Sequence, residues 1–416
     1  MKKTGAAALL TACPAMLTKY ARAQSRVIKI GLVSPETGPL APFAEPDNFV
    51  VERFRKIVAN GITVAGKNYP VQIIVKDSRS DPNRAAELAS ELIKSDKVDL
   101  ITAAATGDTV NPVADQAEIN GVPCVSTDCP WQVYFFGRGG KPDKGFQWTY
   151  HFFWGVEDLI DCYVDMWKSL PTNKVVGALW PNDGEGIAFS DAQRGFPPVL
   201  KANGFTVVDP GRFSSNITDY SSQIAALKRA NCEIMTGVLP PPAFSTFWSQ
   251  AAQQGYKPKI ATPAKAILFP AAVNAIGDRA LGLTTEVWWS PGHPFKSSLT
   301  GQTAAQLCAE YEKTTGKQWS PPLGMKHALF EVALDVFKRT KNLDSRESIL
   351  EAIRTTNYDS VFCHVQWTGN PVKNVCKSPM VGGQWVRGTG KFKYNLLVCN
   401  NDHAKAIPVQ TKMKLL

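Results

Sequence analysis

The sequence lacks the motifs by which several common classes of enzyme are recognised. Its 416 residues contain no G-x-S-x-G nucleophile elbow, no Walker loop and no G-x-G-x-x-G fingerprint. The glycines at 137, 139 and 140 do not have the spacing of that fingerprint. C-x-x-C and H-E-x-x-H are absent as well, and no histidine has metal-ligand spacing to another. We therefore expect a protein without catalysis, metal or cofactor.

Charge is scarce and evenly spread. Charged residues make up 20% of the chain, the formal net charge is +10, and no run of five like charges occurs. Four basic residues and no acid lie within residues 1–23, so the rest has 42 Lys and Arg against 36 Asp and Glu, a net charge of about +6. Nucleic-acid-binding proteins usually gather basic residues into a patch. We expect no nucleic-acid partner.

The N-terminus has the pattern of an export signal. Lys2 and Lys3 precede an uncharged apolar stretch over 6–18, and Ala21-Arg22-Ala23 forms an A-x-A cleavage site. Residues 1–23 are therefore expected to be a signal peptide. A less favoured alternative is a lipoprotein anchored at Cys13, and the segment 3–8 also resembles the tail of a twin-arginine signal whose Arg pair would lie upstream. No later stretch approaches 18 uncharged apolar residues. The mature protein is expected to be soluble and outside the cytoplasm.

Eight cysteines follow the signal, an even number that permits disulfides in an oxidising compartment. Cys363 and Cys376 flank a Gly-Asn-Pro turn and are a candidate hairpin pair. Free buried thiols are the alternative, because connectivity cannot be deduced from sequence.

Strand-like and helix-like segments alternate in two sets, over residues 27–125 and 174–287. This alternation predicts an α/β fold with parallel sheets, and the length predicts two lobes. Three stretches, over 146–155, 286–295 and 362–370, are predicted to cross between the lobes and to form a hinge. The expected N-terminal lobe comprises 24–150 and 291–362, and the expected C-terminal lobe comprises 151–290 and 363–416.

Small and polar residues follow several of the predicted strands in both lobes. In open parallel sheets, ligands bind beyond the carboxyl ends of the strands. Helix caps and turns explain each such loop singly, but their shared position favours a ligand cleft. The loops in question cover residues 34–43, 105–109, 126–131, 181–186, 238–242 and 262–265.

Five segments, over 27–33, 37–41, 76–85, 182–186 and 219–227, resemble the branched-chain amino-acid-binding (leucine-binding) group of ABC-transporter solute-binding proteins, the type I periplasmic binding proteins. The resemblance implies two Rossmann-like lobes joined by a three-strand hinge. It also implies a monomeric periplasmic component of an ABC importer that docks onto permease subunits in the inner membrane. Its ligand would be a small polar or amphipathic molecule such as an amino acid, an amide or a carboxylate. A ligand-sensing protein serving a signalling receptor is the alternative.

The resemblance also implies a set of binding positions, to which we add two tryptophans near the loops. The expected ligand-binding residues are Phe43, Thr106, Gly107, Asp108, Ser126, Thr127, Asp128, Trp131, Asp183, Val238, Lys265 and Trp288.

One of these positions departs from the family pattern. Amino-acid binders in the family place an acidic side chain on the ligand's ammonium, where this sequence has Ala264-Lys265. A lysine there would attract an acid, unless its side chain extends into solvent. Asp108, Asp128 or Asp183 could supply negative charge instead. A plain branched-chain amino acid is therefore not the expected ligand.

Overall fold

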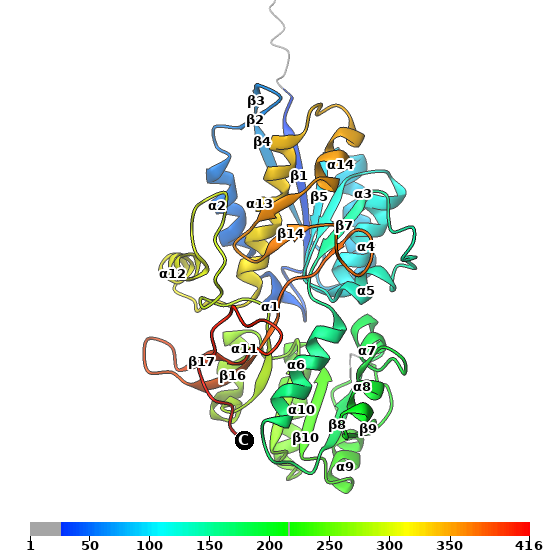
Figure 1. The fold of residues 1–416 in the computed structure, drawn as a ribbon, viewed down its shortest axis with the longest axis vertical. Coiled ribbons are helices and arrows are strands. Elements are labelled where there is room, and N and C mark those ends of the chain that lie inside the picture. The colour runs from blue at the N-terminus through cyan, green and yellow to red at the C-terminus, as the bar shows by residue number, and fades with distance from the viewer. Residues whose placement is uncertain (1–25, 215–216) are drawn as a thin grey trace, which may run out of the picture.

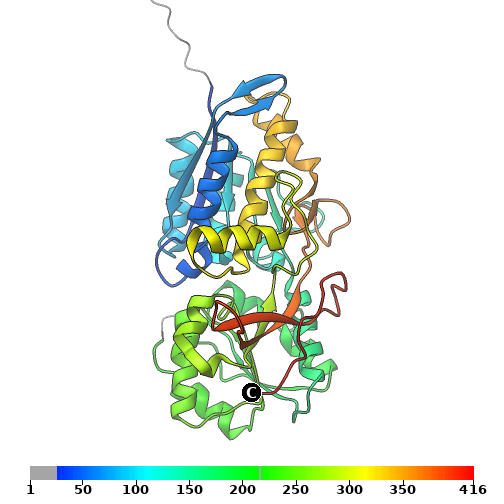
Figure 2. The same ribbon diagram turned by 90° about the vertical axis from the view of Figure 1, so that its left-hand side faces the viewer.

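The computed structural model describes residues 26–214 and 217–416, which form two lobes stacked along the long axis of the molecule (Figure 1). The expected signal peptide, the alternative anchor at Cys13 and the twin-arginine-like segment lie outside the described residues. The view turned by 90° shows the same two lobes, with several segments of the chain running from one lobe to the other (Figure 2).

The upper lobe in Figure 1 is built on a six-stranded parallel sheet. All four residues of its strand β5 are buried, as expected of a parallel sheet covered by helices on both faces. In spatial order its strands are β15 (Val375–Cys376), β7 (Thr149–Phe152), β6 (Cys124–Ser126), β5 (Leu100–Ala103), β1 (Ile28–Ser34) and β4 (Val71–Asp77).

The lower lobe contains a four-stranded parallel sheet and a three-stranded antiparallel sheet. The parallel strands, in order, are β11 (Ile260–Ala264), β10 (Ile234–Val238), β8 (Val175–Leu179) and β9 (Thr206–Val208). The antiparallel strands are β12 (Thr284–Val287), β16 (Val381–Arg387) and β17 (Tyr394–Asn400). Two small hairpins, β2 (Ile62–Val64) with β3 (Lys67–Tyr69) and β13 (Asn357–Asp359) with β14 (His364–Gln366), complete the strands. The predicted α/β class with two parallel-sheet lobes is confirmed.

Helices cover the sheets of both lobes. Those of the upper lobe are α1 (Ala41–Ala44), α2 (Asp47–Ile57), α3 (Pro82–Lys94), α4 (Thr106–Ile119), α5 (Trp131–Phe135), α12 (Ala304–Thr315), α13 (Pro322–Arg339) and α14 (Arg346–Arg354). Those of the lower lobe are α6 (Val156–Lys168), α7 (Gly184–Phe189), α8 (Phe196–Ala202), α9 (Ser221–Arg229), α10 (Pro241–Gln253), α11 (Pro270–Ile276) and the 3₁₀ turn η1 (Gly277–Ala280).

Local chemistry sets where these helices begin. Asp81 is the N-cap of α3, since its carboxylate accepts a hydrogen bond from the Arg84 N–H and Pro82 opens the helix. The chain turns at 190–195 after α7, and α8 begins at Phe196 with two prolines in its first turn. Lys265 has a φ of +70°, which an α-helix does not accommodate, and α11 begins at Pro270.

Three connections join the lobes, at 153–155, 288–303 and 377–380. The third was expected at 362–370, but β15 still pairs in parallel with β7 at the edge of the upper sheet. We therefore propose that the last lobe boundary falls after Cys376 rather than between residues 362 and 363.

The cysteine pairing considered above is absent. Cys363 and Cys376 are free buried thiols, as are five of the other six cysteines that follow the signal, while Cys399 is free and partly exposed. Burial raises the pKa of Cys376 to about 11, so this thiol stays protonated at neutral pH.

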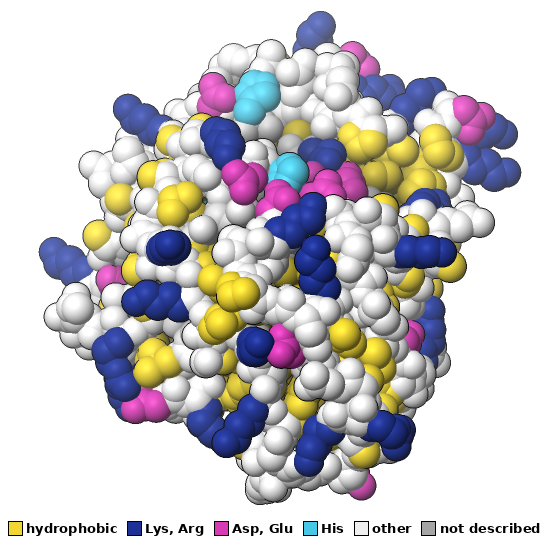
Figure 3. Space-filling model, turned by 60° about the horizontal axis from the view of Figure 1, so that its bottom comes forward, with side chains coloured by type: hydrophobic (Ala, Val, Ile, Leu, Met, Phe, Trp, Pro, Cys, Tyr) yellow, Lys and Arg dark blue, Asp and Glu magenta, His cyan; other side chains and the backbone are white. Residues whose placement is uncertain are grey.

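Basic side chains on the face of the lower lobe shown in Figure 3 are scattered among uncharged ones rather than gathered into one patch. Within 26–214 and 217–416, no helix combines the length and apolar character needed to cross a bilayer.

A buried ion pair joins α13 to α2, and the same lysine also donates a hydrogen bond to the end of β1. The Lys326 Nζ lies 2.9 Å from an Asp47 carboxylate oxygen on α2 and donates a hydrogen bond of 3.0 Å to the Ser34 hydroxyl. The side chains of Lys326 and Asp47 are only 1% and 2% exposed. Removing one partner of such a pair leaves an uncompensated charge in a medium that solvates it poorly.

Lys326→Met is therefore expected to lower the free energy of unfolding by about 3 kcal/mol, measured by urea denaturation. The matched control is Lys317→Met, which removes the surface pair of Lys317 with Glu45 and should cost less than about 1 kcal/mol. Equal losses for the two variants would show that the buried pair has no special role.

Candidate functional site

The carboxyl ends of the strands of both sheets meet at the junction of the lobes, where residues of both lobes line a cavity of about 20 Å³. Loops after β5 and β6 of the upper lobe and after β10, β11 and β12 of the lower lobe contribute to its wall. We call it the inner cavity. It is lined by Phe43, Thr106, Asp128, Cys129, Pro130, Phe153, Trp154, Glu185, Phe189, Val238, Ala264, Lys265, Glu286 and Trp288.

Aromatic rings form one part of this wall. Trp288 lies 6.1 Å from Phe43 and 5.2 Å from Phe153 between ring centroids, and Phe153 lies 4.8 Å from Trp154. The indole Nε1 atoms of Trp154 and Trp288 are buried and find no hydrogen-bond acceptor in the described part of the chain. Buried indole N–H groups usually have a partner, so both donors are available to a molecule in the cavity.

An ion pair lies beside these rings. The Lys265 Nζ is 2.9 Å from Glu185 Oε2, and both side chains are almost fully buried. The other carboxylate oxygen, Glu185 Oε1, accepts a hydrogen bond of 2.9 Å from the backbone N–H of Gly107. Gly107 belongs to the first turn of α4 in the upper lobe, where free N–H groups and the helix dipole favour an anion. Glu185 of the lower lobe thus occupies the anion position of the upper lobe.

A second buried carboxylate fixes the backbone of Lys265. Glu286 Oε1 accepts a hydrogen bond of 2.8 Å from the Lys265 N–H, while Oε2 accepts from the hydroxyls of Tyr163 and Thr285. These bonds hold Lys265 in its left-handed conformation, with φ of +70°. Because its acceptors are used within the lower lobe, we assign Glu286 a positioning role.

Asp128 is the buried carboxylate without such partners. It also has a left-handed backbone, with φ of +72°, and its carbonyl accepts a hydrogen bond of 2.8 Å from the Thr106 N–H. Both its carboxylate oxygens and the Thr106 hydroxyl lack hydrogen-bond partners among the described residues. Burial raises the pKa of Asp128 well above the ordinary value of an aspartate.

Asp108 and Asp183 are half-buried, one in each lobe, and neither lines the inner cavity. Burial and the charge of Glu185 raise the pKa of Asp108 to about 6. Burial alone would lower the pKa of Lys265, but the carboxylates of Glu185, Asp183 and Asp108 outweigh this effect and raise it. The lysine therefore stays charged, and the acids of the two lobes repel one another above pH 6.

Asp108→Asn is expected to raise the free energy of unfolding by about 1 kcal/mol at pH 7.5. This figure is smaller than the pKa shift alone implies, because solvent screens the charge of a partly exposed side chain. A carboxyl whose pKa is raised in the folded protein opposes folding once it is ionised. The gain should fall through pH 6 and vanish below pH 4, where Asp108 is protonated in both states. Denaturation of both proteins between pH 4 and 8 tests this, with Asp143→Asn at an exposed site as the control. A gain that does not change with pH would contradict it.

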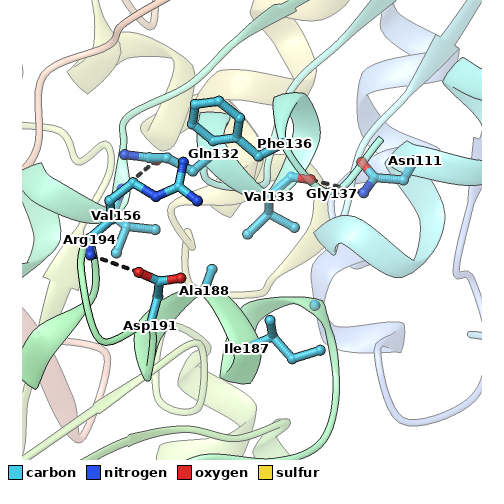
Figure 4. Close-up of a pocket in the computed structure, with 11 residues that line it drawn as sticks. Asn111, Gln132, Val133, Phe136, Gly137, Val156, Ile187, Ala188, Asp191 and Arg194 are labelled. Carbon is cyan, nitrogen blue, oxygen red and sulfur yellow. Dashed lines mark hydrogen bonds between the residues drawn. The ribbon is translucent and has the colours of Figure 1, made fainter. Parts of the chain in front are cut away.

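A second cavity, of about 380 Å³, lies next to the inner one, and we call it the outer cavity. Figure 4 shows Val133 and Phe136 of the upper lobe facing Ile187 and Ala188 on α7 of the lower lobe, with Arg194 beside them. The Arg194 guanidinium lies 4.5 Å from the Phe136 ring centroid. The outer cavity also lies between the lobes, so parting of the lobes would open both cavities together.

The structure gathers half of the residues named from the sequence around the inner cavity, namely Phe43, Thr106, Asp128, Val238, Lys265 and Trp288. Gly107 takes part through its N–H bond to Glu185, and Asp108 and Asp183 act through the effect of their charges on Lys265. The expectation that Lys265 could extend into solvent is wrong, because the residue is 5% exposed.

Three of the named residues are engaged elsewhere. The Ser126 hydroxyl contacts the β7 carbonyl of Tyr150 and the His151 ring, and the Thr127 hydroxyl donates to the carbonyl of Phe152. The indole of Trp131 donates to Glu157. None of the three lines the inner cavity, and we leave them out of the proposed site.

Glu185 and Trp154 are the residues that sequence reasoning missed. Glu185 is not among the expected binding residues, but it is 3% exposed and paired with Lys265. It lies in the first turn of α7, within the predicted loop 181–186 that follows a strand. Trp154 lies in the first predicted crossing, where an aromatic residue is equally consistent with hinge packing.

The chain belongs to the periplasmic binding protein family, whose model matches residues 27–390. Its fold is that of the type I periplasmic binding proteins, as the resemblance implied. A leucine-binding protein from Thermotoga maritima is 20% identical, with a TM-score of 0.70 over 90% of this chain and 99% of that one.

Two further solved structures were obtained with ligands. A solute-binding protein of an ABC transporter from Rhodopseudomonas palustris, in complex with 3,4-dihydroxybenzoic acid, is 20% identical with a TM-score of 0.70, over 91% of this chain and 99% of that one. A branched-chain amino-acid transporter substrate-binding protein from Streptococcus pneumoniae, in complex with isoleucine, is 16% identical with a TM-score of 0.69, over 90% and 100%. At sequence identities this low, the similarity to these solved structures shows a shared fold and no more.

Proposed function

We propose that the protein is the solute-binding component of an ABC importer, which closes its two lobes over a small molecule and delivers it to the permease outside the cytoplasm. One observation carries the proposal. A cavity between the lobes is lined by residues of both lobes and holds buried polar atoms that have no hydrogen-bond partner among the described residues.

Those unpaired atoms favour a ligand site over ordinary core packing. A buried donor or acceptor left without a partner costs about 1–3 kcal/mol, and the Asp128 carboxylate, the Thr106 hydroxyl and the two indoles are all in this state. A solute that supplies the missing partners converts this cost into binding free energy. The site thus has the composition of a ligand pocket, with apolar walls and a few convergent polar groups.

The connections between the lobes provide the motion that such a site needs. The lining of the inner cavity comes from both lobes, so parting of the lobes would widen the way in for a solute. Three connections at one side of the molecule allow the lobes to rotate as rigid bodies about a hinge, as in other two-lobed binding proteins. The closed lobes then present one continuous surface, which we expect the permease to recognise.

Filling the cavity tests the proposal. A thermal-shift screen over amino acids, amides, amines and small carboxylates identifies a ligand, because a molecule that binds the folded state raises the melting temperature. Ala264→Phe, which places a ring in the inner cavity, should weaken that ligand's affinity at least tenfold in titration calorimetry. Ala225→Phe, on the exposed face of α9, should leave the affinity unchanged.

Small-angle scattering provides the second measurement. The ligand is expected to lower the radius of gyration of the wild-type protein as the lobes close. A ligand that binds wild type and Ala264→Phe equally well, or that binds without compaction, would contradict the proposal.

A further inference from the structure

We propose that the inner cavity selects a small organic cation that carries N–H donors, such as an amidinium, guanidinium or primary ammonium group, and that it rejects carboxylates. This inference rests on the proposed function, because it assigns a class of ligand to the same cavity. Three features of the cavity lead to it: a filled anion position, an unpaired carboxylate and a wall of aromatic rings.

The anion position is filled by the protein itself. A ligand carboxylate would be drawn to Lys265 and to the N–H of Gly107, the cation and the helix N-terminal donor of the cavity. Both already bind Glu185, at 2.9 Å each. A ligand carboxylate would have to displace a buried, charge-assisted pair or lie unpaired beside it, and both are costly.

The unpaired polar group of the cavity is an acid. Both carboxyl oxygens of Asp128 lack hydrogen-bond partners within residues 26–214 and 217–416, and the two buried lysines whose charge reaches Asp128 are already engaged. Lys326 is paired with Asp47 and Lys265 with Glu185. Burial raises the pKa of Asp128, and a cation with N–H donors offsets this effect and satisfies the carboxylate in both charge and hydrogen bonding. An anion would instead lie beside three buried acids that line the cavity, Asp128, Glu185 and Glu286.

The aromatic wall also favours a cation. Phe43, Phe153, Trp154 and Trp288 line the cavity beside Asp128, and the faces of aromatic rings attract cations, most strongly where water is excluded. A volume of about 20 Å³ admits roughly one water-sized group. The cavity as it stands therefore admits only part of a cationic head, and a molecule the size of acetamidinium requires the lobes to part further.

Three molecules of nearly identical shape separate charge from size, namely acetamidinium, acetamide and acetate. Titration calorimetry of the wild-type protein should show acetamidinium binding at least tenfold more tightly than acetamide, with no binding of acetate. Asp128→Asn should weaken acetamidinium at least tenfold and remove its advantage over acetamide. Asp143→Asn, at an exposed site of the same lobe, should bind as wild type does.

A second variant tests the filled anion position independently of Asp128. Glu185→Ala removes the internal carboxylate and leaves Lys265 and the Gly107 N–H without their partner. Acetate should then bind and raise the melting temperature of Glu185→Ala, while leaving that of the wild type unchanged. Acetamide should not raise the melting temperature of Glu185→Ala.

The outcomes separate the two proposals. Tighter binding of acetate or acetamide than of acetamidinium by the wild type, or no binding of acetamidinium, overturns the cation inference. Equal acetamidinium affinity in wild type and Asp128→Asn overturns it as well. If another solute then binds with compaction of the lobes, the proposed solute-binding function stands without the inference. If no solute compacts the lobes, the proposed function fails too.

Discussion

The Glu185 carboxylate is the contact on which the junction of the lobes depends. One of its oxygens binds Lys265 within the lower lobe, and the other accepts the Gly107 N–H at the N-terminus of α4 in the upper lobe. Because the group is almost fully buried, water cannot replace either partner. A single side chain thereby neutralises the lysine, caps a helix and joins the lobes.

The same contact determines which ionisable group of the cavity remains without a charged partner. Lys265 and Lys326, the buried lysines nearest to Asp128, are each held by an acid of their own. Asp128 remains, with its carbonyl bound to the Thr106 N–H and with two carboxyl oxygens that have no hydrogen-bond partner among the described residues. Where the resemblance implied an acid at the end of a lower-lobe strand, this chain has Lys265, which is paired with Glu185.

Local patterns in the sequence were sufficient for the architecture. Alternating strands and helices predicted two parallel-sheet lobes, and the family resemblance implied binding positions of which Phe43, Thr106, Asp128, Val238 and Lys265 line one cavity. These predictions succeed because periodicity and strand direction are set by short stretches of chain.

Features that depend on contacts between distant segments were not predictable. Glu185 is 80 residues from Lys265 and 78 from Gly107, so nothing near it in the sequence distinguishes it from a solvated loop acid. The third connection was expected too early, because the two-residue strand β15 has no pattern of its own and is defined by its pairing with β7. The backbone conformation of Lys265 was not predictable either, because its positive φ depends on the distant Glu286 carboxylate.

A crystal structure of the wild-type protein grown with acetamidinium tests the central claim most directly. The account predicts the amidinium N–H groups within hydrogen-bond distance of the Asp128 carboxylate, with Glu185 still bound to Lys265 and to the Gly107 N–H. A bound amidinium that leaves Asp128 without a partner, or a structure with acetate in which the anion lies against Lys265 and Glu185 has turned away, would contradict it.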